Sequence, residues 1–262
     1  MNKDKTLDTH FKIHLIVTCI LTIYFSINLF DAISLQKNMY DFLQNATNIL
    51  NVSYVIIPAL LIVLVSHLST KNLNNLFLLR YRNKYSFYKK NIKSIFLIVT
   101  KFVCEIIGII TLISIFLLDS QNEWSLFAKN YFKNFPLFLE DFSPLLYVVH
   151  SFILLWLFLL FLSLFYFIIL LITKNTAVSL IVTILVIVTN MAVTISHLEL
   201  LGQFSFTKHL DFVQYVYEHQ TGSSLSSFPF ELYIYWSILL LILYISGYKL
   251  IHKLDLDLKK GA

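Results

Sequence analysis

The sequence has few charged residues and little glycine. Only 13% of its 262 residues are Asp, Glu, Lys or Arg, whereas 58% are hydrophobic and the mean hydropathy is +0.74. Soluble domains carry roughly a quarter charged residues, so a soluble fold of this length could not cover so many apolar side chains. The composition therefore predicts an all-α membrane protein that crosses the bilayer several times.

The scarcity of glycine, cysteine and histidine clusters excludes several kinds of site. The five glycines stand singly, so no glycine-rich loop can hold a nucleotide phosphate. Cys19 and Cys104 lie far apart in apolar runs, which excludes a disulfide framework and a zinc ribbon; we expect both to be buried structural thiols. His67, His150 and His197 lie near the ends of different apolar runs, and their spacing predicts no metal site.

Six apolar runs are long enough to cross a hydrocarbon core, which takes about 20 residues. They cover residues 12–30, 52–69, 94–118, 144–173, 176–197 and 233–251. The outer segments between them are residues 31–51, 119–143 and 198–232. We expect a single transmembrane domain, residues 1–262, with short outer helices that lie in the interface or re-enter the membrane between spans five and six.

Basic residues are concentrated on one side of these spans. With the N-terminus inside, fifteen of the twenty Lys and Arg residues fall in inner segments or at inner span ends. The positive-inside rule then predicts that both termini are cytoplasmic. The net charge of +5 belongs to this topology and does not indicate a nucleic-acid partner. Composition rich in Lys, Asn, Ile and Phe is typical of a low-GC Gram-positive source, which places the chain in a bacterial plasma membrane.

One inner loop, residues 70–93, combines basic and aromatic side chains. It holds seven Lys and Arg residues and no acid, with Leu and Tyr at roughly helical spacing among them. One interpretation is an anchor beneath anionic lipid headgroups. The other is a coupling helix that docks on a separate ATPase, because Arg and aromatic residues are enriched at protein contacts. The residues assigned to this coupling are Arg80, Tyr81, Arg82, Lys84, Tyr85, Tyr88 and Lys89.

The run from Leu79 through Arg80 and Arg82 to Lys89 resembles the basic segment of type-2 ABC exporter permeases. In particular it is similar to small Gram-positive permeases, some of which serve bacteriocin or lantibiotic immunity, and residues 204–219 look like their membrane-dipping hairpin. The resemblance covers the whole chain in the number and order of its spans, but only this loop in its amino-acid sequence. It implies a permease that pairs with itself or a sister subunit. Two copies of an ABC ATPase would supply ATP and magnesium, and this chain would bind no cofactor and hold no catalytic residue.

Two polar residues lie deep in the predicted spans. Glu105 in span three has Lys101 one turn earlier on the same face. It either pairs with Lys101 or faces a cavity for an amphipathic or hydrophobic cargo, such as an antimicrobial peptide or a lipid-like compound. Asn190 in span five either joins helices by a hydrogen bond or lines the same cavity.

Two other functions stay open from the sequence. A non-transporting immunity or sensor protein would show the same spans and act by binding a partner or peptide. An intramembrane peptidase would need paired acids, or a His placed to activate a cysteine. The sequence predicts neither arrangement at membrane depth.

Overall fold

The computed structural model describes residues 3–68, 84–134, 136–195, 205–210, 212 and 230–260. Its regular elements are α1 (Lys3–Ser34), α2 (Met39–Ala46), α3 (Ile49–Asn51), the π-helix η1 (Val52–Ile56), α4 (Ile57–His67), α6 (Lys84–Ser114), α7 (Leu126–Tyr131), α8 (Pro136–Asp141), α9 (Pro144–Thr173), α10 (Thr176–Ile195), α12 (Phe206–Leu210) and α14 (Phe230–Lys260).

Six helical stretches within these ranges are long and apolar enough to cross a membrane. They are His10–Ser34, Ile49–His67, Tyr85–Ser114, Pro144–Thr173, Thr176–Val193 and Phe230–Lys253. Within the described residues, the prediction of an all-α protein with six helices able to span a membrane is confirmed.

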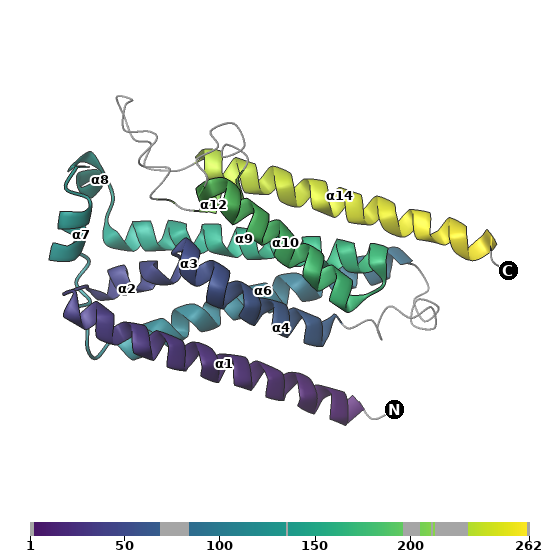
Figure 1. Ribbon diagram of the computed structural model, residues 1–262, viewed down its shortest axis with the longest axis horizontal. Helices are drawn as coiled ribbons and strands as arrows, with labels where there is room; N and C mark the ends of the chain where they lie inside the picture. Colours follow the sequence, from purple (N-terminus) through teal and green to yellow (C-terminus); the bar gives the residue numbers. More distant parts are fainter. Residues whose placement is uncertain are drawn as a thin grey trace.

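Helix α9 is the centre of the bundle (Figure 1). It contacts α14, α10 and α6. Of the residues in its most apolar stretch, 72% are buried inside the protein, against 11% for α10. Apolar residues all round a helix are typical of such a position. Lys174 ends α9 in the left-handed region (φ 53°), and the side chain of Asn175 accepts the N–H of Ala177 at 2.9 Å. This tight turn sends α10 back along α9.

The second span contains a π-helical turn, η1, directly ahead of Pro58. Proline has no N–H to donate, and its ring presses on the preceding turn of an α-helix. A wider π turn relieves this pressure while the helix continues. The span from α3 through η1 to α4 is therefore one helix with an irregularity at its proline.

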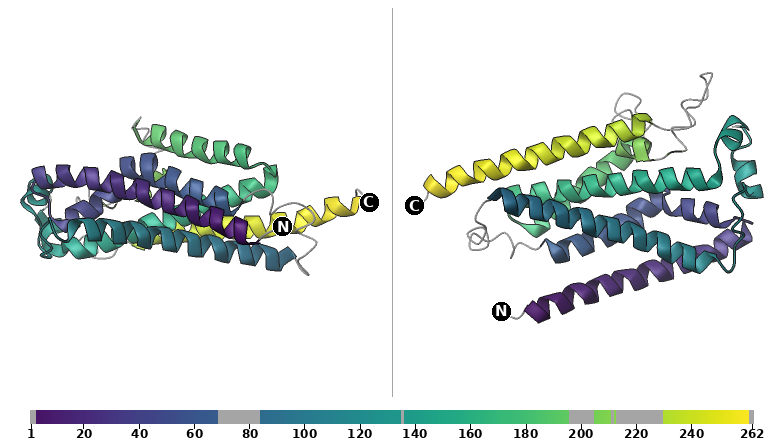
Figure 2. Two further views of the ribbon diagram at one scale, coloured as in Figure 1. Left: turned by 90° about the horizontal axis from the view of Figure 1, so that it is seen from below. Right: turned by 180° about the vertical axis from the view of Figure 1, so that it is seen from behind.

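The two ends of the bundle differ (Figures 1 and 2). The start of α1, the start of α6 and the end of α14 lie at one end, which we call the terminal end. Helices α2, α7 and α8 lie at the other, the capped end. An even number of spans brings both termini to the same end, as expected. That this end is cytoplasmic stays a prediction.

Helix α6 begins earlier than the predicted third span. It starts at Lys84, so residues 84–93 of the predicted loop form its first turns. Lysine lowers the hydropathy of this stretch, but it is a good helix former. Phe87 and Tyr88 of the same stretch are buried in the bundle. The helix therefore extends beyond the predicted span into the predicted loop, and the point at which it enters the membrane stays a prediction.

Both cysteines are exposed, contrary to expectation. Cys19 lies on α1 and Cys104 on α6, on faces that point away from the other helices. An apolar run does not indicate which face of a helix packs, because the outer face of a membrane helix is apolar as well.

Candidate functional site

The capped end is joined by hydrogen bonds between segments that are distant in sequence. Asn38 accepts the N–H of Asp41 at 2.9 Å, and Asp41 Oδ2 accepts the N–H of Asn38 at 3.2 Å. This capping box starts α2. The Asn38 side chain also donates to the Glu123 carbonyl at 2.7 Å, and Met39 N–H donates to the Asp119 carbonyl at 2.9 Å. These bonds connect the first predicted outer segment to the second.

An aromatic cluster fills the space beneath these segments. The Trp124 indole donates to the carbonyls of Leu139 and Phe142, at 3.1 and 2.9 Å. Phe212, which follows α12, packs on Tyr147 of α9 at 5.5 Å between ring centroids. The cluster thus joins residues of the second and third outer segments to the central helix. Further rings in it are Phe132, Phe138 and His150.

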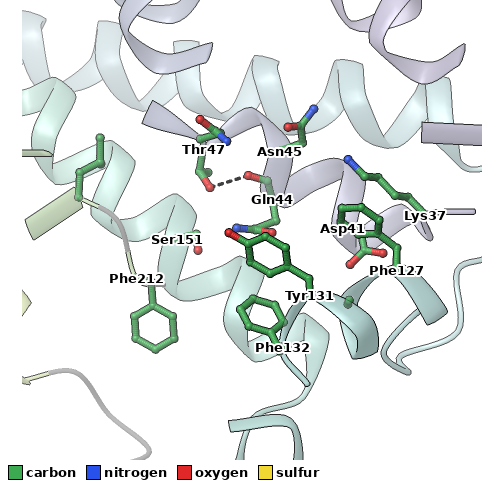
Figure 3. Close-up of a pocket in the computed structure, with 13 residues that line it drawn as sticks. Lys37, Asp41, Gln44, Asn45, Thr47, Phe127, Tyr131, Phe132, Ser151 and Phe212 are labelled. Atoms are coloured by element: carbon green, nitrogen blue, oxygen red, sulfur yellow. Dashed lines mark hydrogen bonds between the residues drawn. The ribbon is translucent and has the colours of Figure 1, made fainter. Parts of the chain in front are cut away.

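A polar pocket of about 160 Å³ lies between these segments (Figure 3). Helix α2 and the residues after it supply carboxylate, amide and hydroxyl groups, and α7 supplies aromatic rings. Its lining residues are Lys37, Asp41, Gln44, Asn45, Thr47, Asn48, Phe127, Ala128, Tyr131, Phe132, Ser151, Leu210 and Phe212. The Nζ of Lys37 lies 4.5 Å from the centroid of the Phe127 ring. All three predicted outer segments therefore contribute to one pocket.

Asp41 is the acid of this pocket, and its side chain is only 9% exposed. Burial raises the pKa of its carboxyl above the ordinary value. Hydrogen bonds with Ser125 and Asn38 and the charge of Lys37 act in the opposite direction without cancelling this effect. A cation bound in the pocket would stabilise the ionised form of Asp41.

A second cavity, an apolar cleft of about 560 Å³, lies at the depth of the spans. Helix α10 forms one wall, and α1, η1 and α4 form the other; α10 itself runs along one side of the bundle (Figure 2). Only Ser53, Tyr54 and Ser66 bring polar side-chain groups to it. Its other lining residues are Ile13, Ile57, Pro58, Leu61, Ile62, Val65, Leu180, Ile184, Ile187, Val188 and Met191.

Glu105 is partnered by α1 and not by Lys101. The Thr18 hydroxyl donates to Glu105 Oε1, and Nδ1 of His14 lies 3.5 Å from Glu105 Oε2. Lys101, one turn earlier on α6, is exposed. The sequence offered pairing of Glu105 with Lys101 within α6; the structure instead pairs Glu105 with residues of α1. Glu105 lines neither the pocket nor the cleft.

Asn190 connects α10 to the capped end. Its side-chain oxygen accepts a hydrogen bond from the Ser205 hydroxyl at 3.0 Å, just before α12. Asn190 lines neither cavity, although its neighbour Met191 lines the cleft. The structure therefore does not bring Glu105 and Asn190 together, and their assignment to a cargo cavity stays a prediction.

The predicted coupling residues are only partly described. Arg80, Tyr81 and Arg82 lie outside the described residues, as does the side chain of Lys84. Lys89 is exposed on the first turns of α6. Tyr85 is 39% exposed and its ring meets that of Tyr248 on α14 at 5.5 Å.

Tyr88 requires a correction, because its side chain is fully buried. Its hydroxyl donates to the Tyr244 carbonyl on α14 at 2.7 Å, and its ring stacks on Phe167 of α9. A residue in this position cannot touch a docked subunit. It joins α6 to α14 and α9 instead.

Sequence reasoning missed Lys37, Asp41 and the histidines of α1. The pattern Asn38-x-x-Asp41 is a capping-box signature that could have located α2. His10 and His14 stand four residues apart, so they share a face of the first span. The ring of His10 stacks on that of His67 at 4.7 Å between centroids. Among the described side chains, no three potential ligands converge on a metal position.

The described helices define an all-helical, multi-pass membrane protein with a polar pocket at one end and an apolar cleft at span depth. Over 250 residues, 95% of its length, the chain is 32% identical to the uncharacterized protein BH0177 of Halalkalibacterium halodurans, of which the match covers 91%. The chain belongs to the same family as that protein. No family model matches the chain, and no solved structure matches it.

Proposed function

We propose that the chain is the membrane-spanning permease subunit of an ATP-driven exporter in a bacterial plasma membrane. Its cargo is amphipathic or hydrophobic, an antimicrobial peptide or a lipid-like compound. It acts as a dimer, with itself or with a sister permease, and a separate ABC ATPase drives it. The observation that carries this proposal is the apolar cleft between α10 and α4.

The cleft suits a cargo that partitions into the bilayer. Its walls are almost entirely aliphatic, and they extend from Ser53 and Tyr54, near one end of span two, to Ser66, near the other. Ligand cavities are mostly apolar and have volumes of about 300–1,000 Å³, which includes the size of this cleft. An apolar compound could enter it from the membrane without exposing its hydrocarbon to water.

The terminal end offers a route from an ATPase to the cleft. The basic loop that resembles a coupling segment leads into α6, and Tyr88 fixes the start of α6 to α14 and α9. Helix α9 in turn packs on α10, one wall of the cleft. Displacement of the loop by ATP closure would therefore move packed helices as a unit. Such a rearrangement between two states is how a nucleotide changes access to a cavity.

The cleft is tested by substituting Ile184→Trp, which fills it from α10. Leu185→Trp is the matched control, because Leu185 is exposed on the same helix but does not line the cleft. The assay is ATP-dependent uptake of a fluorescent cationic amphipathic peptide into inside-out vesicles from the native host. We expect Ile184→Trp to reduce uptake several-fold and Leu185→Trp to leave it unchanged. Equal uptake by both variants would contradict a role for the cleft.

A second candidate function is a membrane immunity or sensor protein that binds without transport. The polar pocket at the capped end favours it, because a binding protein needs a site exposed to its ligand. The two functions differ in their need for ATP. Uptake that is the same with ATP and with a non-hydrolysable analogue would support the binding protein. An intramembrane peptidase is the third candidate, and no described contact supports it.

A further inference from the structure

The pocket at the capped end holds charges of both signs. Lys37 and Asp41 both line it, but the Lys37 ammonium lies over the Phe127 ring and not against the carboxylate. Asp41 is nine-tenths buried, with Oδ2 accepting the Asn38 N–H at 3.2 Å. The pocket is thus lined by one cation and one anion at separate positions.

A zwitterion is the ligand that complements both charges. A purely anionic ligand would approach Asp41 with like charge, and a purely cationic one would approach Lys37 in the same way. A neutral ligand would remove water from both charges without replacing it. An ammonium group gains further from Tyr131 and Phe132, whose rings also line the pocket, because aromatic rings attract cations.

Hydrogen-bonding groups complete the pocket. Gln44, Asn45 and Thr47 bring amide and hydroxyl groups to the same wall as Asp41 (Figure 3). The Thr47 hydroxyl already donates to the Gln44 carbonyl at 2.8 Å, so the groups that can donate to phosphate oxygens are the side-chain amides of Gln44 and Asn45. The pocket, at about 160 Å³, is smaller than the usual cavity for a drug-sized molecule. It fits a polar headgroup and not a folded peptide segment.

The position of the pocket indicates that the headgroup comes from the membrane. Asn45, Thr47 and Asn48 directly precede the second span, which begins at Ile49. Ser151, on the opposite wall, lies two turns inside the fourth span. The pocket is therefore at the ends of the spans, the depth at which the phosphate and amine of a phospholipid lie.

We propose that this pocket binds the headgroup of a zwitterionic phospholipid. Its phosphate meets Lys37 and the amide groups of α2, and its ammonium meets Asp41 and the aromatic rings. The inference does not depend on export, because a sensor or immunity protein could hold such a lipid equally well.

The test is binding of dihexanoyl-phosphatidylethanolamine to the purified, delipidated chain in detergent, measured by thermophoresis. We expect Lys37→Gln and Asp41→Asn each to weaken binding about five- to tenfold, since each removes one charge-assisted contact. The matched controls are Lys129→Gln on α7 and Glu140→Gln on α8. Both residues are exposed and outside the pocket, so these variants should bind as the wild type does. If Asp41→Asn disturbs the fold of α2, Tyr131→Leu provides a second test of the pocket. Tyr131 lines the pocket but is 57% exposed, so its replacement should leave the fold intact and still weaken binding.

Two further ligands decide between sources and charges. Dihexanoyl-phosphatidylglycerol, which lacks the ammonium, should bind more weakly, and equal binding would overturn the charge assignment. Glycerophosphoethanolamine, which lacks acyl chains, should also bind more weakly, and equal binding would indicate a soluble ligand instead of a lipid. Displacement of the lipid by a lysine-rich peptide at equal concentration would show that the pocket selects cations, and it would overturn the proposal as well.

Discussion

Gly247 leaves room for Tyr88 where α6 meets α14. A Cβ at position 247 would lie 2.6 Å from the Tyr88 hydroxyl oxygen and 2.9 Å from a ring carbon. Tyr88 cannot turn away freely, because it is fully buried and its hydroxyl donates to the Tyr244 carbonyl. At the scale of single residues, one missing methyl group thus permits the contact between the two helices.

We predict that Gly247→Ala lowers the free energy of unfolding by about 1–3 kcal/mol, the usual cost of overpacking a core. Gly108→Ala is the control, since the added Cβ has no atom within 4 Å apart from its chain neighbours and the backbone of its own helix. Alanine is the better helix former by about 1 kcal/mol, so this variant should be as stable as the wild type or more stable. Thermal unfolding in detergent measures both. Equal loss of stability in the two variants would show that the contact with Tyr88 is unimportant.

Asp41 gives the capped end a dependence on pH. Burial raises the pKa of its carboxyl in the folded chain, so the folded state binds a proton at a pH where the unfolded state does not. Stability then rises as the pH falls from neutral through the raised pKa towards the ordinary value. We predict this increase in the unfolding temperature of the wild type, and a smaller increase in Asp41→Asn. Asp31→Asn, at an exposed position, is the control and should behave as the wild type does.

Among the helices, α1 is weakly buried: only 22% of the residues in its most apolar stretch lie inside the bundle. Its polar connection to α6 runs through Glu105, which accepts the Thr18 hydroxyl and lies near His14. Polar groups at membrane depth join helices because lipid offers them no partner. Glu105 therefore has a structural role between α1 and α6, whether or not it also meets cargo.

We predict that Thr18→Val lowers stability by about 0.5–1.5 kcal/mol, the range for one hydrogen bond between helices. Thr22→Val is the matched control. The Thr22 hydroxyl donates only within α1, to the Thr18 carbonyl at 2.8 Å, so its loss leaves the contact with α6 intact. The unfolding temperature in detergent separates the two variants. A smaller loss for Thr18→Val than for Thr22→Val would contradict the role of Glu105 as a helix connector.

At the level of the helices, the sequence predicted the positions of the apolar stretches, which hydropathy reports. It did not predict which face of each helix packs against the others. The fourth span was predicted at residues 144–173, and α9 has these bounds. Helix α6 begins at Lys84, ahead of the predicted third span, because Lys84 to Lys93 lower hydropathy without preventing a helix. The burial of Tyr88 and the exposure of both cysteines depend on helix rotation, which hydropathy does not report.

On the scale of the whole molecule, the two cavities could not be predicted from the sequence. The cleft arises because α10 packs on α9 but leaves space beside α4, and the pocket needs three segments from different parts of the chain. The site assignments from the sequence, by contrast, rested on charge and depth. Those properties predicted the basic terminal end, but they could not give Glu105 its partners on α1.

The central claim is that an ATPase drives this chain, and co-purification tests it most directly. The tagged chain would be isolated from its native membrane in mild detergent, beside Arg80→Ala/Arg82→Ala and the control Lys174→Ala, which lies at the turn between α9 and α10. We expect the wild type and the control to recover a stoichiometric soluble subunit that hydrolyses ATP, and the double variant to lose it. Recovery of the wild-type chain alone, without ATPase activity, would contradict the account.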